Sequence, residues 1–280
     1  WEGEEGATTR VSYRELRERS DRLANGLAAL GVSALDAVGI FLPPTPEAVV
    51  AVMACSKLGA VWLPLFSGFG ADAVAKRLED AQAKVLITAD GFPRRGKVVP
   101  MKETADEAVA SARSVRHVVV VDRIGRRDTP WDHERDLHWD DLLAAHADRF
   151  ETARLDPEHP LFIAYTSGTT GRPKGAVHVH GGFLVKITEE VAYQTDVQPG
   201  DLLFWFADLG WIMGPWEIVG ATALGATVFL FDGAPNHPGP DRLWSMVERH
   251  AITHLGVSPT LVRALIPSGE EPVRSHDLSS

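Results

Sequence analysis

The amino-acid sequence predicts an α/β protein with layered, parallel-rich sheets and helices on both faces. Short apolar runs alternate with amphipathic stretches of helical period along nearly the whole chain. The apolar runs lack the polar alternation of half-exposed strands, which indicates strands buried on both faces, as in parallel sheets. With 280 residues, 45% of them hydrophobic, the chain can bury a sizeable core.

The first predicted helix begins after Ser12, because the run from Ser12 to Glu15 has the pattern of a capping box. Its leucines share one face at residues 16, 23, 27 and 30, and Gly31 is placed to end it. Further strands are predicted at residues 38–42, 61–65, 84–88, 117–121, 161–165, 176–179, 202–206, 227–231 and 254–257. Further helices are predicted at residues 47–58, 72–81, 103–112, 140–146, 183–193, 216–224, 243–250 and 260–266.

A polar, charge-rich excursion near residues 122–150 interrupts the alternation. We expect it to close a first α/β subdomain, residues 1–150, and to precede a second, residues 151–280. The formal net charge of −10 argues against a general nucleic-acid binder, because such proteins present basic faces. No apolar run approaches the roughly 18 residues of a membrane helix, so no membrane partner is expected.

A single cysteine, Cys55, lies within a helical pattern and is interpreted as a small buried hydrophobe. No disulfide can form within these residues, and a cytoplasmic location fits this cysteine usage best. The sequence makes no prediction of the oligomeric state.

The most informative segment is YTSGTTGRPKG, from Tyr165 to Gly175. Its glycines, Gly168 and Gly171 among them, allow backbone N–H groups to approach an anion, and Lys174 adds a positive charge. Short hydroxyl donors stand at Thr166, Ser167, Thr169 and Thr170. A plain surface loop is the alternative, but the position between two predicted strands favours a loop that binds polyphosphate.

The spacing differs from that of a Walker loop. A Walker loop needs Gly, four residues and then Gly-Lys-Ser/Thr, whereas here Gly168, Gly171 and Lys174 fall at intervals of three. A kinase or P-loop ATPase is therefore not expected.

The segment resembles the phosphate loop of the adenylate-forming enzymes, Tyr-Thr-Ser-Gly-Thr/Ser-Thr-Gly-x-Pro-Lys-Gly. Further blocks stand in family order at residues 46–55, 58–60, 66–69, 87–90, 178–182, 207–211 and 258–260. Within that superfamily the chain is similar to the AMP-forming acyl-CoA synthetases, particularly those of the acetyl-CoA synthetase type. The resemblance implies the large N-terminal α/β domain of such an enzyme, incomplete at its C-terminal end. We expect a piece of a longer protein that is inactive alone.

The resemblance also implies a reaction. ATP would activate a short-chain carboxylic acid to an acyl-adenylate with release of pyrophosphate, and the acyl group would pass to CoA. Thr166 and Lys174 would be catalytic. The ATP side would comprise Thr166, Ser167, Gly168, Thr169, Thr170, Gly171, Lys174 and His178. Mg²⁺ is implied as a cofactor, and no ligand for it can be assigned in this sequence.

Two further segments gain a role from the resemblance. Arg94 and Lys97 match the Arg-x-Gly-Arg that contacts the 3′-phosphate of CoA, and Gly68 matches a neighbouring CoA-side turn. From composition alone, residues 94–97 are equally a solvated turn. Lys97 keeps the charge of the second arginine and loses its bidentate geometry.

An acyl pocket is implied at Trp211, Ile212, Met213 and Gly214, where the residues alone also fit plain core packing. Acetate enzymes usually carry threonine where Met213 stands, so the acid used stays open.

His178 and His180 alternate on a predicted strand as a pair of zinc ligands could. No third ligand stands at a matching spacing, which argues against zinc. The resemblance implies instead that this segment lines the nucleotide site.

Two other functions stay open: an adenylate-forming enzyme that delivers to a carrier-protein thiol, and a non-catalytic nucleotide-binding module. Arg94 and Lys97 discriminate the first, because a carrier-dependent enzyme needs no site for the CoA phosphate.

Overall fold

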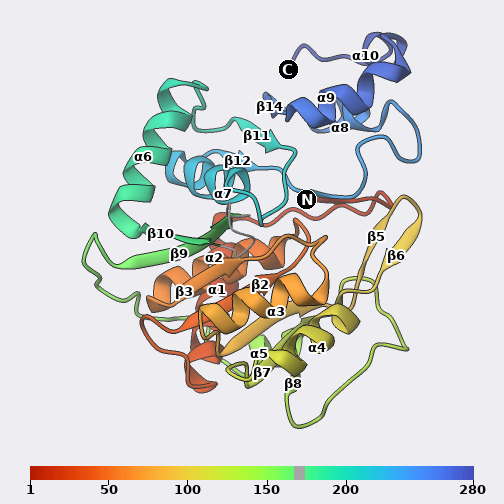
Figure 1. The fold of residues 1–280 in the computed structure, drawn as a ribbon. Coiled ribbons are helices and arrows are strands. Elements are labelled where there is room, and N and C mark those ends of the chain that lie inside the picture. Colours follow the sequence, from red (N-terminus) through yellow and green to blue (C-terminus); the bar gives the residue numbers. More distant parts are fainter. Residues whose placement is uncertain (167–173) are drawn as a thin grey trace.

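A seven-stranded sheet forms the centre of the computed structural model, which describes residues 1–166 and 174–280 (Figure 1). In spatial order its strands are β10 (Lys174–Val179), β9 (Pro160–Thr166), β3 (Val61–Pro64), β2 (Ala37–Phe41), β4 (Val85–Ala89), β7 (His117–Val121) and β8 (Asp136–His138). All neighbours pair parallel except β9 and β10, which are antiparallel. The predicted α/β class with a parallel-rich sheet is confirmed.

Helices cover both faces of this sheet. The sequence predicts this, because its apolar runs indicate strands that are buried on both faces. On one face α1 (Tyr13–Ala29) packs with α2 (Pro46–Leu58) and α5 (Trp139–Ala144), and on the other α3 (Ala71–Asp80) packs with α4 (Met101–Ser111). The division follows from topology. The chain moves one way from β2 to β3 and back the other way from β3 to β4, so right-handed crossovers place α2 and α3 on opposite faces.

The strand order reverses at β2, and open α/β sheets bind ligands beside such a reversal, outside the carboxyl ends of the strands. Three predicted site segments leave the sheet at this edge. Residues 66–70 follow β3, residues 94–97 follow β4, and the loop from 167 to 173 follows β9. Because β9, β3, β2 and β4 are mutually parallel, their carboxyl ends meet along one edge.

A second layer packs beside this sheet. It contains α6 (His180–Tyr193), β11 (Leu202–Trp205), α7 (Met213–Leu224), β12 (Thr227–Val228) and β14 (His254–Gly256). Strands β12, β11 and β14 form a parallel sheet in that order. The helices α8 (Arg242–His250), α9 (Pro259–Leu265), η1 (Ile266–Ser268) and α10 (Glu271–Arg274) follow, with α8 to α10 at the top of Figure 1.

Two short strand pairs complete the fold. The N-terminal β1 (Glu2–Gly3) pairs parallel with β13 (Phe231–Asp232), and β5 (Phe92–Arg94) forms a hairpin with β6 (Lys97–Val99). Strands β1, β5 and β6 were not predicted, and neither were β8, η1 and α10; of β13, only Phe231 lies within a predicted strand, at residues 227–231. Each of these elements has only two to four residues, too few for a periodic signal.

The start of the first helix and the burial of Cys55 agree with the sequence predictions, whereas one predicted strand does not. The capping box at Ser12 is present, with reciprocal hydrogen bonds to Glu15, and Cys55 is fully buried. The single strand predicted at 227–231 is wrong. Residues 227–228 pair with β11, whereas residues 231–232 pair with β1. The predicted strand is therefore divided between two different sheets.

The predicted division into subdomains at residue 150 stays a prediction. β9 and β10 lie on the C-terminal side of that boundary and still complete the sheet of the first half. Across residues 1–166 and 174–280, every helix is too short or too polar to traverse a lipid bilayer.

The capping box gives the first testable prediction. The Ser12 hydroxyl accepts the Glu15 N–H at 3.2 Å, and the Ser12 N–H donates to the Glu15 carboxylate at 2.8 Å. Ser12→Ala should lower the free energy of unfolding by about 1 kcal/mol, measured by chemical denaturation. Ser111→Ala, an exposed serine at the end of α4, is the control and should change it far less. Equal effects of the two variants would contradict the role of the cap.

Candidate functional site

Thr166 and Lys174 face each other where the predicted phosphate loop meets the sheet. Thr166 is the last residue of β9, Lys174 is the first of β10, and the two are register partners. Both are exposed. The other predicted loop residues, Ser167, Gly168, Thr169, Thr170 and Gly171, lie outside the described residues. The sheet therefore holds a hydroxyl and an ammonium group side by side at its carboxyl edge.

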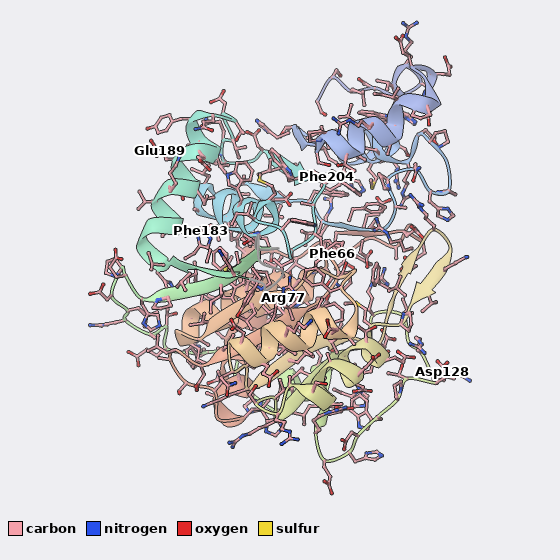
Figure 2. The ribbon with its side chains drawn as sticks, in the orientation of Figure 1. Phe66, Arg77, Asp128, Phe183, Glu189 and Phe204 are labelled. Atoms are coloured by element: carbon pink, nitrogen blue, oxygen red, sulfur yellow. The ribbon has the colours of Figure 1, made fainter. Side chains whose placement is uncertain are left out.

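A buried arginine, Arg77, connects this edge with the turn at residues 66–70. Its guanidinium lies 4.2 Å from the ring centre of Phe69 and 5.7 Å from that of Tyr165, the residue before Thr166. The side chain also donates to the carbonyl oxygen of Ala73 at 2.6 Å. Figure 2 shows Arg77 and Phe66 close to where the upper layer meets the seven-stranded sheet. One cation thus packs against both the turn at residues 66–70 and the end of β9.

Tyr165 is fixed at its other end by α3. Its hydroxyl donates to the Asp80 carboxylate at 2.7 Å. Burial and the neighbouring Asp80 raise the pKa of the Tyr165 hydroxyl well above its ordinary value. The tyrosine therefore stays protonated and serves as a fixed donor at the base of the loop.

The turn at 66–70 is joined to the predicted acyl-pocket segment through Asp208. The Ser67 hydroxyl donates to Asp208 Oδ2 at 2.5 Å, and the Gly210 N–H donates to Oδ1 at 2.8 Å. Burial raises the pKa of Asp208 from 3.8 to about 6, while the hydrogen bonds from Ser67 and Gly210 and the charge of Arg94 oppose part of that rise. Asp208 therefore titrates near neutral pH.

Backbone contact reinforces this junction. A Cβ atom at Gly210 would lie 2.2 Å from the Phe66 nitrogen and 2.3 Å from its Cα, distances that no side chain can adopt. A Cβ atom at Gly214 would lie 2.7 Å from the Cα of Leu209. Glycine is required at 210 because the two segments touch through their main chains.

The predicted pocket residues lie beside this contact. Trp211 is 60% exposed and its ring centre is 5.8 Å from that of Phe66, and Ile212 is 44% exposed. Met213 and Gly214 are the first two residues of α7, which begins three residues earlier than predicted. Their role in an acyl pocket stays a prediction, and Trp211 lies next to the turn at residues 66–70.

Arg94 is the last residue of β5 and Lys97 is the first residue of β6. The two are register partners in this hairpin. Paired residues of an antiparallel hairpin project from the same face, with Cβ atoms about 5 Å apart. Two exposed cations thus share one face. Arg94 donates to the carbonyl oxygen of Gly233 at 3.2 Å, and within the described ranges neither cation forms an ion pair. Gly68 lies within the turn, beneath the Phe66 ring.

His178 lies near the far end of β10 from Lys174. It stacks on Phe162 at 4.4 Å and meets Phe183 edge-on at 5.3 Å, four residues along β10 from Lys174, or about 13 Å. Burial lowers the pKa of His178. The expectation that His180 continues the strand is wrong, because His180 is the first residue of α6. In the described part of the chain, no group of three or more His, Cys, Asp or Glu could hold a metal ion.

Comparison with known proteins identifies the family. The sequence matches the AMP-binding enzyme family over residues 4–280. The chain belongs to the AMP-binding enzymes. An acetyl-coenzyme A synthetase of Chlorobaculum tepidum is 43% identical over all of this chain, which corresponds to 42% of that relative. One from Escherichia coli K12 is 40% identical, again over all of this chain and 43% of the relative.

A solved structure supports the same assignment. The acetoacetyl-CoA synthetase from Streptomyces lividans superposes with a TM-score of 0.91 at 35% identity, covering 99% of this chain and 42% of that protein. The fold of this AMP-binding enzyme chain is therefore that of a segment of an acyl-CoA synthetase. The chain spans less than half the length of the relatives it matches.

Sequence reasoning missed the groups that assemble the site of this AMP-binding enzyme. Ser67, Arg77, Asp208 and the Tyr165 side chain connect segments far apart in the sequence. Ser67, Tyr165 and Asp208 lie inside blocks that carry the family resemblance, and this was the available signal. Arg77 lies in an ordinary amphipathic helix and gave none.

Asp208 gives a pH-dependent prediction. Its pKa of about 6 in the folded protein exceeds the ordinary 3.8, so folding takes up a proton between these values. The stabilising contribution of protonated Asp208 is fully present below pH 3.8 and is lost as the pH rises through about 6. The stability of the wild type relative to Asp208→Asn should therefore fall from pH 4 to pH 7 in unfolding measurements.

Ser67→Ala provides the matched test. Its hydroxyl lowers the pKa of Asp208, so removing it should move the pH-dependent loss to higher pH. A stability difference between wild type and Asp208→Asn that stays constant over this range would contradict the buried titration.

Proposed function

We propose that the complete protein uses ATP to activate a short-chain carboxylic acid and then transfers the acyl group to CoA. Acetyl-coenzyme A synthetases match this chain along its whole length, which supports the reaction class. The main structural support is the register pairing of Thr166 with Lys174 at the carboxyl edge of the sheet, at the two ends of the loop with the family's phosphate signature.

The first step is substitution at phosphorus. A carboxylate oxygen of the acid attacks the α-phosphorus of ATP, the bond to the bridging oxygen of the β-phosphate breaks, and pyrophosphate leaves with the bonding electrons. Negative charge grows on the leaving group. Lys174 and the Thr166 hydroxyl, with the loop between them, are proposed to offset that charge. Because the sheet pairs the backbones of these two residues, their side chains start the reaction from neighbouring positions.

The second step delivers the acyl group. The CoA sulfur attacks the acyl carbonyl carbon, AMP leaves, and the thiol proton passes to solvent. Arg94 and Lys97 are proposed to hold the 3′-phosphate of CoA, and Gly68 to lie along its path. Two like charges directly opposite on a hairpin repel each other, and a bound phosphate would relieve that repulsion. The junction through Asp208 and Gly210 would bring the CoA side next to the acyl group.

The acid is proposed to be short, with Trp211, Ile212, Met213 and Gly214 around its chain. Met213 has a long, flexible side chain, so the pocket volume depends on its rotamer. The structure supports a wall at this place because Trp211 lies against Phe66, next to the Asp208 junction.

Mg²⁺ is proposed as a cofactor of the complete protein. Mg²⁺ usually binds through one or two carboxylates together with substrate phosphates. Among the described residues, no group of three or more His, Cys, Asp or Glu could hold the ion. A cytoplasmic setting and inactivity of residues 1–280 alone likewise remain predictions.

Pyrophosphate release tests the first step. The complete protein should release pyrophosphate in the presence of ATP and one of a panel of acids: acetate, propionate, butyrate and isobutyrate. Lys174→Ala should slow this release about ten-fold or more, a loss of roughly 1.4 kcal/mol in transition-state stabilisation. A pyrophosphatase-coupled assay measures it.

Lys186→Ala is the control, because Lys186 is an exposed lysine paired with Glu190 on α6. It should leave the rate near that of the wild type. If no acid supports release in the wild type, the protein is better described as a nucleotide-binding module. An unchanged rate in Lys174→Ala would remove that residue from the mechanism.

The CoA side gives a separate prediction. Arg94→Ala should raise the KM for CoA and leave the KM for dephospho-CoA, which lacks the 3′-phosphate, near the wild-type value. A loss of about ten-fold corresponds to one weakened charge-assisted contact. Steady-state thioester formation measures both constants. Arg127→Ala, an exposed arginine on another loop, is the control. Turnover that ignores CoA altogether would favour transfer to a carrier-protein thiol.

A further inference from the structure

Glu4 is a buried carboxylate on the N-terminal segment, far in sequence from every residue assigned above. Its side chain is 6% exposed. One oxygen, Oε1, accepts the backbone N–H of Gly96 at 2.8 Å, and the other, Oε2, accepts the backbone N–H of Ala234 at 2.8 Å. A single carboxylate therefore bridges the β5–β6 turn and the segment after β13.

The turn that Glu4 holds is a tight one. Arg95 and Gly96 are its two central residues, with φ of 53° and 69°. This left-handed conformation suits glycine and is unfavourable for arginine, so the turn needs support from outside. The carboxylate supplies that support because it accepts N–H groups that the turn points away from the hairpin ladder.

The ionised state of Glu4 fits this role. Burial raises the pKa of a carboxyl group, but the backbone N–H groups of Gly96, Arg95 and Ala234 outweigh burial and lower the pKa of Glu4 below its ordinary value. The nearby His237 acts in the same direction. At neutral pH the side chain is thus an acceptor at both oxygens.

The same support reaches Arg94. The Arg94 guanidinium donates to the carbonyl oxygen of Gly233, next to Ala234. A Cβ atom at Gly233 would lie 2.8 Å from the Cβ of Glu4, so the two segments are packed in direct contact. Glu4 also donates its own N–H to the carbonyl oxygen of Asp232 at 3.2 Å. Glu4 therefore holds the segment around Gly233 and the tip of the hairpin in a fixed position relative to each other.

We infer that Glu4 is a positioning residue for the CoA phosphate site: by bridging the Gly96 and Ala234 N–H groups it fixes the two cations at Arg94 and Lys97 on one face of the hairpin. The inference rests on the proposed function, because those cations were assigned to CoA there. Glu4 contacts no substrate, since its carboxylate is occupied by the protein backbone. Because the Gly96 N–H donates to Glu4, it is not free to bind a phosphate. The phosphate ligands are therefore the side chains of Arg94 and Lys97.

The test compares CoA with dephospho-CoA in the complete protein. Glu4→Gln replaces one acceptor with an amide donor that must face either the Gly96 or the Ala234 N–H. It should raise the KM for CoA about five-fold or more, with the KM for dephospho-CoA and the rate of acid-dependent pyrophosphate release unchanged. Glu5→Gln is the matched control, because Glu5 is the adjacent, exposed acid paired with Arg123, and it should leave all three values unchanged.

Two results would overturn the inference: equal losses with CoA and dephospho-CoA, or an unchanged KM for CoA in Glu4→Gln. Arg94→Ala separates this failure from that of the proposed function. If Arg94→Ala discriminates the two thiols and Glu4→Gln does not, the CoA site stands and the role of Glu4 falls. If Arg94→Ala also fails to discriminate, the CoA site itself is misassigned.

A measurement on the wild type covers the case in which Glu4→Gln does not fold. The Gly96 and Ala234 amides should exchange slowly with deuterium, because each donates to a buried carboxylate. Rapid exchange at Gly96 would overturn the bridge. Glu4→Asp keeps the charge and shortens the reach, so it should raise the KM for CoA and again spare dephospho-CoA. An Asp variant identical to the wild type would contradict the need for a side chain that spans both donors.

Discussion

Parallel pairing of β9 with β3 is the constraint on which the candidate site depends. It joins the strand before the predicted phosphate loop to the sheet formed by the first half, and Trp62 and Phe162 stack across the pair at 4.3 Å. Parallel strands end at the same edge, so the carboxyl ends of β9, β3 and β4 lie along one side of the sheet. The polar contacts then set the fine positions of groups that the sheet has already brought together.

Most of the fold could be predicted from the sequence, because long apolar and amphipathic runs have a period that identifies the element. The capping box at Ser12 even located a helix boundary. The strand at 227–231 failed for a physical reason: hydrogen-bond partners divide it, and β1 competes for its second half. Local propensity carries no information on which distant strand supplies the partner.

The candidate site was predictable only in part. The loop signature singled out Thr166 and Lys174 as candidates and the resemblance singled out Arg94, since each belongs to a contiguous pattern. Asp208 and Glu4 were not predicted, because their importance arises from partners 141 and 92 residues away. A lone acidic residue in a sequence most often lies in solvent. Only the folded arrangement shows which carboxylates accept buried N–H groups.

The main-chain contact between Gly210 and Phe66 also limits how the pocket segment can be exchanged between relatives. The two segments fit as a matched pair, with no room at Gly210 for even a methyl group. Transplanting residues 207–214 from another AMP-binding enzyme would therefore succeed only if the incoming backbone followed the same path past residue 66. A chimaera that carries both segments therefore has a better prospect of folding than one that carries either alone.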